Sequence, residues 1–400
     1  MNRYIKAGSL FLSLGFVILT SCEPKKGPDK NIPKLLLEET KQEFVPDKRV
    51  ALLDLEIEKR AGKIIVKGES NLPKAVAAFK ERMADENIVF IDSIQLLPSA
   101  ELNGFTQGLI TLSVANLRSK PAHSSELVTQ ATLGTPVTIY KEENNWYLIQ
   151  TPDRYLSWVD GGGITPISEK KYKEWKATQK VIYTQTIGHA YTQPNKDSQV
   201  VSDMVAGGVL EFLGEEKEFY KISFPDGRQA FVHKGESQDY DNWLAALQPS
   251  RESLISTAKT LMGVPYLWGG TSTKGVDCSG FTKTIYFLNG IVLPRDASQQ
   301  VHTGKQVDEV KEFNKLVPGD LLFFGRPATE TSKERVVHVG MWIGNNEFIH
   351  SAGRVHISSV DKNADNFDEY NFNRYLRANR YLHEPMDGLI ELAKNPVFKD

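Results

Sequence analysis

The chain has 400 residues, of which 40% are apolar. This is more than one hydrophobic core usually organises, so several domains are expected. The 48 Lys and Arg residues nearly balance the 50 Asp and Glu residues, giving a net charge of −2. Such a balance argues against nucleic acid or another polyanion as the partner.

The first residues have the pattern of an export signal. Arg3 and Lys6 precede an apolar run from Leu10 to Leu19, which is too short to span a bilayer comfortably. The run closes on a Leu-Thr-Ser-Cys segment that resembles a bacterial lipoprotein box and ends at Cys22. We therefore expect residues 1–21 to be a signal peptide and Cys22 to carry a lipid. The alternative is an ordinary secretory signal with a chance cysteine.

The segment after Cys22 is rich in Pro, Lys and Gly, as a flexible tether is. We assign residues 22–44 to a lipid-anchored tether, which places the protein in the cell envelope. No other segment is long and apolar enough to span a membrane. We expect the protein to lie on the periplasmic face.

Residues 45–112 predict a small α/β subdomain. Alternation from Val50 to Ile57, the run at 63–67 and the segment IVFID each predict a strand. A stripe with helical spacing lies between them, behind Pro73 at a plausible first helical position; its members are Leu72, Val76, Phe79 and Met83. This subdomain offers no chemistry.

Residues 113–236 read as two copies of one unit. Tyr147 matches Tyr220 and Val159 matches Val232, each at a distance of 73 residues (220 − 147 = 232 − 159 = 73). Each copy contains about five short β-type runs separated by turn residues, a pattern typical of small closed barrels. The pair resembles tandem bacterial SH3-like domains, over residues 113–168 and 180–236. The alternative is a pair of structural spacers without a ligand.

Once Cys22 is lipidated, Cys278 has no intramolecular partner. Structural cysteines in an oxidising compartment normally occur in pairs, so an unpaired thiol favours chemistry. A helical stripe follows it as far as Gly290 and places Cys278 at a helix N-terminus. There the helix dipole is expected to bring the thiol pKa from ~8.5 into the range ~3.5–7.5. The free N–H groups could also hold an oxyanion.

Two histidines fall in one predicted β-hairpin. If Gly344, Asn345 and Asn346 form its loop, Gly340 lies opposite His350, and His338 shares their face. The histidines are then diagonal neighbours, as a base and its orienting partner must be. A two-residue loop would put them on opposite faces. A zinc site would need three or four ligands, so no metal or organic cofactor is predicted.

Six segments of the C-terminal third occur in the order typical of NlpC-type cell-wall cysteine peptidases, compact relatives of the papain fold. They are YLWGG, DCSGF, LPRDASQQ, VPGDLLFF, HVGMWIG and IHS. The resemblance covers residues 250–385 and implies a helix-borne cysteine packed on an antiparallel sheet, within a multidomain α+β protein. It implies Cys278 as nucleophile, His338 as general base and His350 as orienting residue.

Tandem SH3-like domains before such a domain resemble the γ-D-glutamyl-L-diamino acid endopeptidases of the dipeptidyl-peptidase VI type. This implies hydrolysis of the γ-D-Glu–diamino acid bond in muropeptides with a free N-terminal L-Ala, releasing L-Ala-D-Glu. The family pattern places five residues near the dipeptide, with the first barrel contributing two of them: Tyr266, Asp277 and Ser279, then Glu126 and Tyr155. A monomer is expected.

Several alternatives remain at this point. The same scaffold could be an amidase or acyltransferase acting on intact wall, or the chain could be a non-catalytic wall-binding lipoprotein. Glu126 and Tyr155 could be surface decoration of a barrel. The polar insert at 325–336 could form a lid or a solvated excursion. The diamino acid could be diaminopimelate or lysine.

Overall fold

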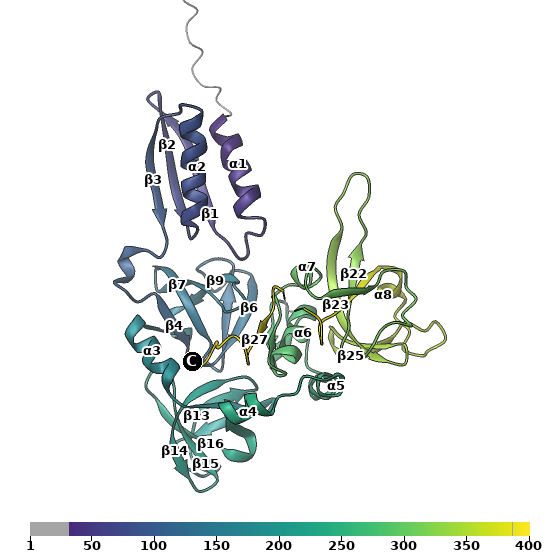
Figure 1. The fold of residues 1–400 in the computed structure, drawn as a ribbon. Coiled ribbons are helices and arrows are strands. Elements are labelled where there is room, and N and C mark those ends of the chain that lie inside the picture. Colours follow the sequence, from purple (N-terminus) through teal and green to yellow (C-terminus); the bar gives the residue numbers. More distant parts are fainter. Residues whose placement is uncertain (1–31, 386) are drawn as a thin grey trace, which may run out of the picture.

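The computed structural model describes residues 32–385 and 387–400. It confirms a multidomain α+β protein in which a small N-terminal subdomain, two β-barrels and a catalytic-type domain follow one another along the chain (Figure 1). The predicted signal peptide and Cys22 lie outside the described residues. Within the described part of the chain, no helix combines the length and apolar character needed to cross a membrane.

The N-terminal subdomain is a three-stranded sheet with two helices packed against it. Its elements are α1 (Ile32–Phe44), β1 (Leu53–Arg60), β2 (Lys63–Ser70), α2 (Pro73–Asp85) and β3 (Phe90–Leu96). β2 pairs antiparallel with β1 and parallel with β3. The predicted stripe of α2 is buried at Val76, Phe79 and Met83, because these side chains share the face that meets the sheet.

Helix α1 corrects the prediction of a tether over residues 22–44. Residues 32–44 form a helix whose Leu36 and Leu37 are buried in the same core as α2. Its Thr40 hydroxyl accepts a hydrogen bond from Arg82 of α2 at 2.7 Å. An anchoring tether could therefore extend no further than residue 31.

The two barrels repeat one another strand for strand. The first consists of β4 (Gln107–Ile110), β5 (Val114–Arg118), β6 (Leu127–Thr132), β7 (Pro136–Glu143), β8 (Trp146–Gln150), β9 (Leu156–Asp160) and β10 (Ile164–Ile167). The second consists of β11 (Lys180–Tyr183), β12 (Ile187–Tyr191), β13 (Val200–Val205), β14 (Val209–Glu216), β15 (Phe219–Ser223), β16 (Gln229–His233) and β17 (Ser237–Asp239). The offset of 73 residues is confirmed from β4 and β11 onward (180 − 107 = 73).

This correspondence moves two predicted boundaries. β17 pairs with β11, so the second barrel ends at Asp239 and not at residue 236. β4 pairs with β7 and β10, so the first barrel begins at Gln107 and not at residue 113. Helix α3 (Glu169–Ala177) connects the barrels, and α4 (Tyr240–Ala246) follows the second. The barrels touch through backbone, since Val209 N–H donates to Leu133 O at 2.9 Å.

The C-terminal domain is a six-stranded antiparallel sheet with helices packed against it. The sheet order is β21 (Lys305–Asp308), β26 (Tyr375–Arg380), β22 (Leu321–Arg326), β23 (Arg335–Gly344), β24 (Glu347–Ala352) and β25 (Arg354–Ser359). The helices are α5 (Arg251–Thr260), α6 (Cys278–Phe287), α7 (Ala297–Gln300) and α8 (Glu369–Asn373). Two short pairs complete it: β18 (Thr271–Ser272) with β19 (Gly275–Val276), and β20 (Ile291–Val292) with β27 (Ile390–Glu391).

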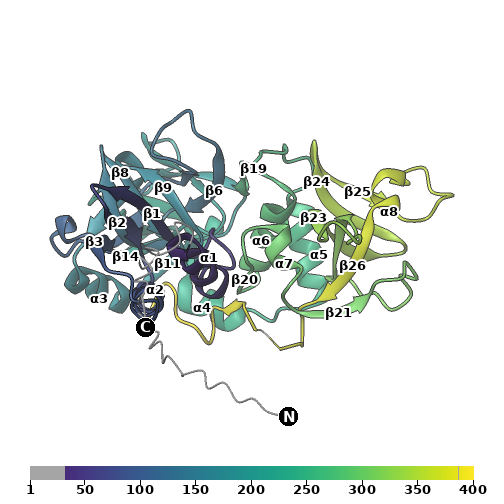
Figure 2. The ribbon, with the colours of Figure 1, turned by 90° about the horizontal axis from the view of Figure 1, so that it is seen from above.

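The first barrel is fastened to the loop that precedes α6. Gln130 of β6 accepts from the Thr271 backbone and from the Ser272 hydroxyl, each at 3.0 Å. Gly269, at φ +78°, is needed for this approach, because a Cβ there would lie 2.3 Å from Leu127 O. Lys283 of α6 forms a buried ion pair with Asp153 of the barrel. Barrel and nucleophile helix are thus held together at several points, and both views show them side by side (Figures 1 and 2).

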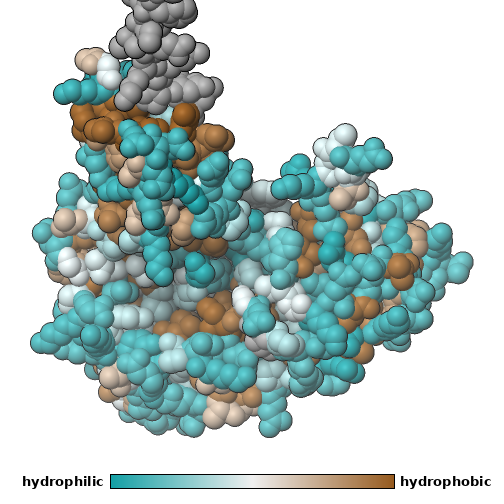
Figure 3. All heavy atoms as spheres, turned by 45° about the horizontal axis from the view of Figure 1, so that its top comes forward, coloured by the Kyte–Doolittle hydropathy of each residue, from teal (hydrophilic) through white to brown (hydrophobic). Residues whose placement is uncertain are grey.

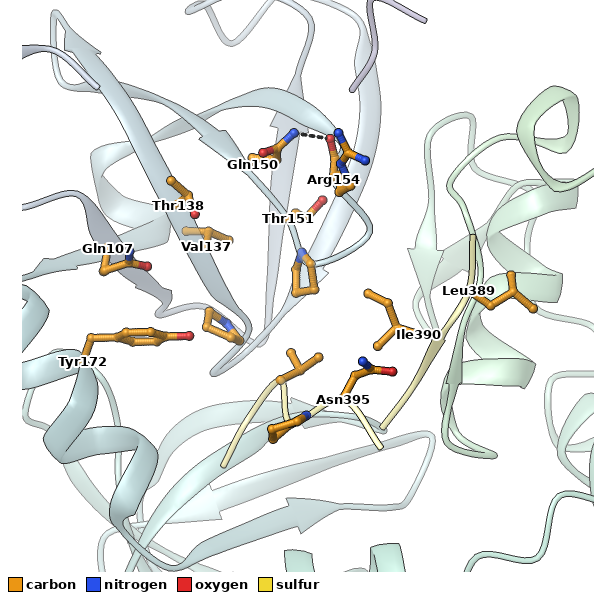
Figure 4. Close-up of a pocket in the computed structure, with 14 residues that line it drawn as sticks. Gln107, Val137, Thr138, Gln150, Thr151, Arg154, Tyr172, Leu389, Ile390 and Asn395 are labelled. Carbon is orange, nitrogen blue, oxygen red and sulfur yellow. Dashed lines mark hydrogen bonds between the residues drawn. The ribbon is translucent and has the colours of Figure 1, made fainter. Parts of the chain in front are cut away.

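The last residues extend beyond the predicted domain end at 385 and return to the barrels. β27 pairs with β20, and Phe398 is buried against Tyr240 and Phe287. The tail also forms one wall of a pocket of about 560 Å³, in which Ile390 and Asn395 face the first barrel and Tyr172 of α3 (Figure 4). On the face of the molecule seen in Figure 3 the surface is mainly hydrophilic, and it is hollowed between the N-terminal half and the C-terminal domain.

Candidate active site

Cys278 is the first residue of α6, as the sequence predicts. The Asp277 side chain caps the helix by accepting a hydrogen bond from Gly280 N–H at 2.7 Å. This hydrogen bond fixes the first turn of α6, which carries the thiol. The backbone N–H groups of Val339 on β23 and of Ser279 are oriented toward the sulfur and act to lower the thiol pKa. The N–H of Cys278 itself has no acceptor among the described residues. The helix start therefore lies directly against the strand that carries His338.

Asp277 is held by a residue that the sequence analysis did not single out. Arg295, only 1% exposed, donates to both carboxylate oxygens of Asp277, at 2.6 and 3.2 Å, and to the Ser279 hydroxyl at 3.0 Å. Gly269 N–H donates to the same carboxylate at 3.0 Å. The Asp277 carboxylate is thus satisfied inside the protein, and it fixes the cysteine turn and the YLWGG loop to one another.

The histidine hairpin has the predicted register by an unexpected route. Met341 pairs with Ile349 and Trp342 with Phe348, as a three-residue loop requires. The loop itself contains only Asn345 and Asn346, both with left-handed backbone, as in a type I′ turn. A β-bulge between Trp342 and Gly344 absorbs the extra residue, so the histidines stay on one face.

The two rings form the beginning of a hydrogen-bonded chain. His338 Nε2 lies 2.8 Å from His350 Nδ1, and His350 Nε2 lies 3.0 Å from the Ser358 hydroxyl of β25. Gly340 allows this packing, since a Cβ there would come within 3.1 Å of His350 Cβ. With His338 Nε2–H donating to His350 and His350 Nε2–H donating to Ser358, Nδ1 of His338 is left unprotonated. That nitrogen is available to take a proton.

Burial keeps all three groups neutral, which corrects the expected thiolate. Burial is the main reason that the pKa of the Cys278 thiol rises to about 12, and the Asp277 charge raises it further. Burial likewise holds the pKa of His338 well below 6.5, with the charges of His350 and Arg374 adding to the effect. It lowers the pKa of His350 to about 3. Desolvation outweighs the helix start here, so the unliganded site holds a neutral thiol beside neutral imidazoles.

The buried His350 should make the protein sensitive to mild acid. Its pKa is about 3 in the folded state and near 6.5 when exposed, so below pH 6.5 the unfolded state binds more protons. Stability should therefore fall as the pH drops from 6.5 to 5, with a slope approaching ~1.4 kcal/mol per pH unit for this residue. Urea unfolding at several pH values measures the slope. It should be shallower in His350→Asn and unchanged in the exposed control His302→Asn; equal slopes in all three proteins would contradict the prediction.

The first barrel contributes both predicted residues to the edge of this region. Trp268, 63% exposed, donates its indole N–H to Glu126 at 2.9 Å. The Tyr155 hydroxyl donates to Asp296 at 3.3 Å, and burial together with Asp296 raises the pKa of Tyr155. Asp296 also accepts from Arg49 at 2.7 Å. Tyr155 is therefore a buried interface residue, whereas Glu126 is an exposed residue that contacts Trp268 across the interface.

Tyr266 lies close enough to Cys278 for the two groups to interact. Asp277 and Ser279 are buried and hold the turn that carries Cys278 through their hydrogen bonds to Gly280 and Arg295. Burial raises the pKa of Tyr266 to about 12, and the charges of Cys278 and Asp277 add to this. Sequence reasoning missed Arg295, Asp296 and Ser358. The first two lie in the quoted segment LPRDASQQ, and an arginine next to an aspartate was the available signal. Among the described residues, no cluster of three or more His, Cys, Asp or Glu side chains could hold a metal ion.

Comparison with known proteins agrees with this architecture. Residues 263–372 match the NlpC/P60 family, and residues 113–165 match the bacterial SH3 domain. A γ-D-glutamyl-L-lysine dipeptidyl-peptidase of Bacillus cereus is 32% identical over 275 residues, which cover 65% of this chain and 77% of that protein. The enzyme of that name from Bacillus subtilis is 31% identical, over 56% of this chain and 71% of the relative.

A solved structure extends the similarity to the fold. The crystal structure of an NlpC/P60 family protein from Bacillus cereus superposes with a TM-score of 0.59 at 27% identity, over 69% of this chain and 99% of that one. The alignment thus takes in nearly the whole of that protein. From its cysteine-bearing helix, its histidine hairpin and these relatives, the chain belongs to the NlpC/P60 family of cysteine peptidases.

Proposed function

We propose that this protein hydrolyses the bond between the γ-carboxyl of D-Glu and a diamino acid in peptidoglycan-derived peptides with a free N-terminal L-Ala. The products are L-Ala-D-Glu and the remaining peptide. The observation that carries this proposal is the placement of Cys278 at the start of α6, against the strand of His338 and beside a barrel that presents Glu126 and Tyr155. The names of the two Bacillus relatives describe the same bond class.

In the proposed mechanism, substrate binding precedes ionisation of the thiol. The Cys278 proton passes to Nδ1 of His338 as the sulfur attacks the γ-carbonyl, and the N–H of Cys278 stabilises the oxyanion. The imidazolium gives that proton to the leaving amine, which frees the diamino acid and leaves a thioester. Water then attacks the thioester, losing a proton to His338, and the thiol is restored. His350 positions His338 and holds its tautomer through the hydrogen bond to Nε2.

Recognition of the free amine is proposed to lie on the barrel side. Three carboxylates and two guanidinium groups form a connected series there, with a net charge of −1 (2 − 3 = −1); its members are Asp47, Arg49, Asp296, Arg295 and Asp277. Glu126 of the same barrel adds a negative charge where it contacts Trp268. A substrate ammonium compensates this charge and can donate charge-assisted hydrogen bonds to Glu126 and Asp296. The Asp277 carboxylate already accepts hydrogen bonds from Arg295, so its proposed role is to position the turn that carries Cys278 and not to bind the ammonium.

We also propose that the protein is a monomeric envelope lipoprotein anchored through Cys22, most consistent with the periplasmic face. The support is the sequence pattern of residues 1–22 and the similarity to a γ-D-glutamyl-L-lysine dipeptidyl-peptidase. The proposed chemistry needs no metal or organic cofactor, because thiol, imidazole and water supply each step.

Product analysis tests this function. Mass spectrometry of L-Ala-γ-D-Glu-diaminopimelate incubated with the mature protein should show L-Ala-D-Glu and the free diamino acid. N-acetylation of the alanine should reduce kcat/KM on the order of 10²-fold, because the carboxylates of Glu126 and Asp296 then lack their ammonium partner. Equal cleavage of both peptides would favour a wall amidase or acyltransferase. Cleavage of neither, with binding to wall fragments intact, would favour a non-catalytic binding lipoprotein.

A further inference from the structure

A basic pocket lies at the base of the β22–β23 hairpin. It has a volume of about 440 Å³ and is lined by Gly325, Arg326, Arg335, Val337, Tyr370 and Arg374. We call it the arginine pocket. Three of its six residues are arginines, and the exposed faces of Val337 and Tyr370, 43% and 71% exposed, complete it. Such a lining suits a ligand that has both an anionic and an apolar part.

The guanidinium groups of the arginine pocket form no ion pair with any residue in the described part of the chain. Arg326 and Arg335 face one another as a strand pair, and neither forms an ion pair with a described residue. Arg374 donates to the neutral Asn371 side chain at 2.7 and 3.0 Å and lies over the Tyr370 ring, 4.2 Å from its centroid. By contrast, Arg377 of the adjacent β26 is paired with Glu334, which directly precedes Arg335, at 2.5 Å. Three like charges gathered without a counterion favour binding of an anion.

The arginine pocket adjoins the reacting groups. Val337 of its lining directly precedes His338 in β23, and Gly325 directly follows Phe324, whose ring centroid lies 5.7 Å from that of His338. The positive charge of Arg374 is also felt at His338, where it helps to lower the pKa. The arginine pocket therefore borders the segment of β23 that carries His338.

The pocket and the first barrel lie on opposite sides of the nucleophile helix. In Figures 1 and 2 the barrel flanks α6 on one side, and the β22–β23 hairpin with α8 flanks it on the other. If the L-Ala ammonium is held at Glu126 and Asp296, the peptide enters from the barrel side. The residue beyond the cleaved bond must then extend toward the arginine pocket.

We propose that the arginine pocket binds a carboxylate of the leaving diamino acid, and so selects a leaving residue with a side-chain carboxylate. Diaminopimelate has such a carboxylate, whereas lysine ends in an ammonium alone. A guanidinium matches a carboxylate with two parallel hydrogen bonds, and uncompensated arginines repel a lone ammonium. This inference rests on the proposed function and adds the identity of the leaving residue. The names of the two Bacillus relatives give lysine as that residue.

The test compares two peptides and three proteins. kcat/KM is measured for L-Ala-γ-D-Glu-diaminopimelate and L-Ala-γ-D-Glu-L-Lys with the wild type, with Arg326→Gln/Arg335→Gln, and with the control Arg251→Gln on the exposed side of α5. The wild type should prefer diaminopimelate by about 10-fold or more. The double variant should lose about 10- to 100-fold on that peptide and little on the lysine peptide. The control should match the wild type on both.

The outcomes separate the two proposals. Equal efficiency of the wild type on both peptides, or an equal loss on both in the double variant, overturns the inference while the proposed hydrolysis stands. Cleavage of neither peptide by the wild type overturns the proposed function and the inference with it. A third peptide, in which the side-chain carboxyl of diaminopimelate is amidated, should behave as the lysine peptide does. If it is cut as well as the parent peptide, carboxylate recognition is refuted.

Discussion

Replacing Cys278 by alanine should lower turnover of the γ-glutamyl peptide on the order of 10⁴-fold or more. The sulfur is the proposed nucleophile at the start of α6, which packs against the strand that carries His338. Without it the thioester intermediate cannot form. Release of L-Ala-D-Glu, followed by mass spectrometry, measures the effect.

A fold control accompanies this variant. Cys278 packs in the core of the C-terminal domain and makes no hydrogen bond through a side-chain donor, so alanine should leave the near-UV circular dichroism spectrum unchanged. Cys278→Ser replaces the thiol by a hydroxyl, which is a much weaker nucleophile, and this variant should be almost as inactive as Cys278→Ala. Full turnover by the alanine variant would refute the nucleophile assignment.

Replacing Arg295 by alanine should destabilise the C-terminal domain by about 3–5 kcal/mol and strongly reduce its activity. The guanidinium is 1% exposed, and its removal leaves the buried Asp277 carboxylate and the Ser279 hydroxyl without their main donor. Because Asp277 caps α6, the turn that carries Cys278 should shift as well. Urea unfolding of the full chain gives the loss of stability.

Two further substitutions show whether the loss of stability in Arg295→Ala is due to the burial and the geometry of its ion pair with Asp277. Arg295→Lys keeps the charge but cannot donate in parallel to both carboxylate oxygens, so it should recover only part of the stability. Arg228→Ala breaks an ion pair with Asp226 in which both side chains are at least 32% exposed, and it should cost at most about 1 kcal/mol. A similar small cost at Arg295 would show that the capped turn does not depend on this pair.

The sequence predicted the parts of the fold that depend on local patterns. The stripe of α2, the helix after Cys278 and the 73-residue repeat are all periodic features, and each can be read without knowing its neighbours. The roles of Cys278 and the two histidines were predicted from motifs, and those of the barrel residues Glu126 and Tyr155 from the family resemblance.

What the sequence did not predict depends on long-range packing. Helix α1 follows a Pro- and Lys-rich stretch, and its role becomes clear only when Leu36 and Leu37 meet α2. The pairing of Arg295 with Asp277 joins residues 18 positions apart, through the return of the chain after α6. The thiol pKa was predicted from the helix start alone, whereas burial by β23 and its neighbours decides its direction.

The returning C-terminal tail has a consequence for how the enzyme discriminates among peptides. Phe398 packs between α4 and α6, and Lys176 of α3 donates a hydrogen bond to Pro396 O at 2.7 Å. The C-terminal tail therefore contacts the helix between the barrels, the helix after the second barrel and the helix of Cys278. With the modules braced in this way, neither barrel is free to swing away from the cysteine. We therefore expect the site beside Cys278 to keep a fixed width, so that peptides are selected without an opening and closing motion in each catalytic cycle.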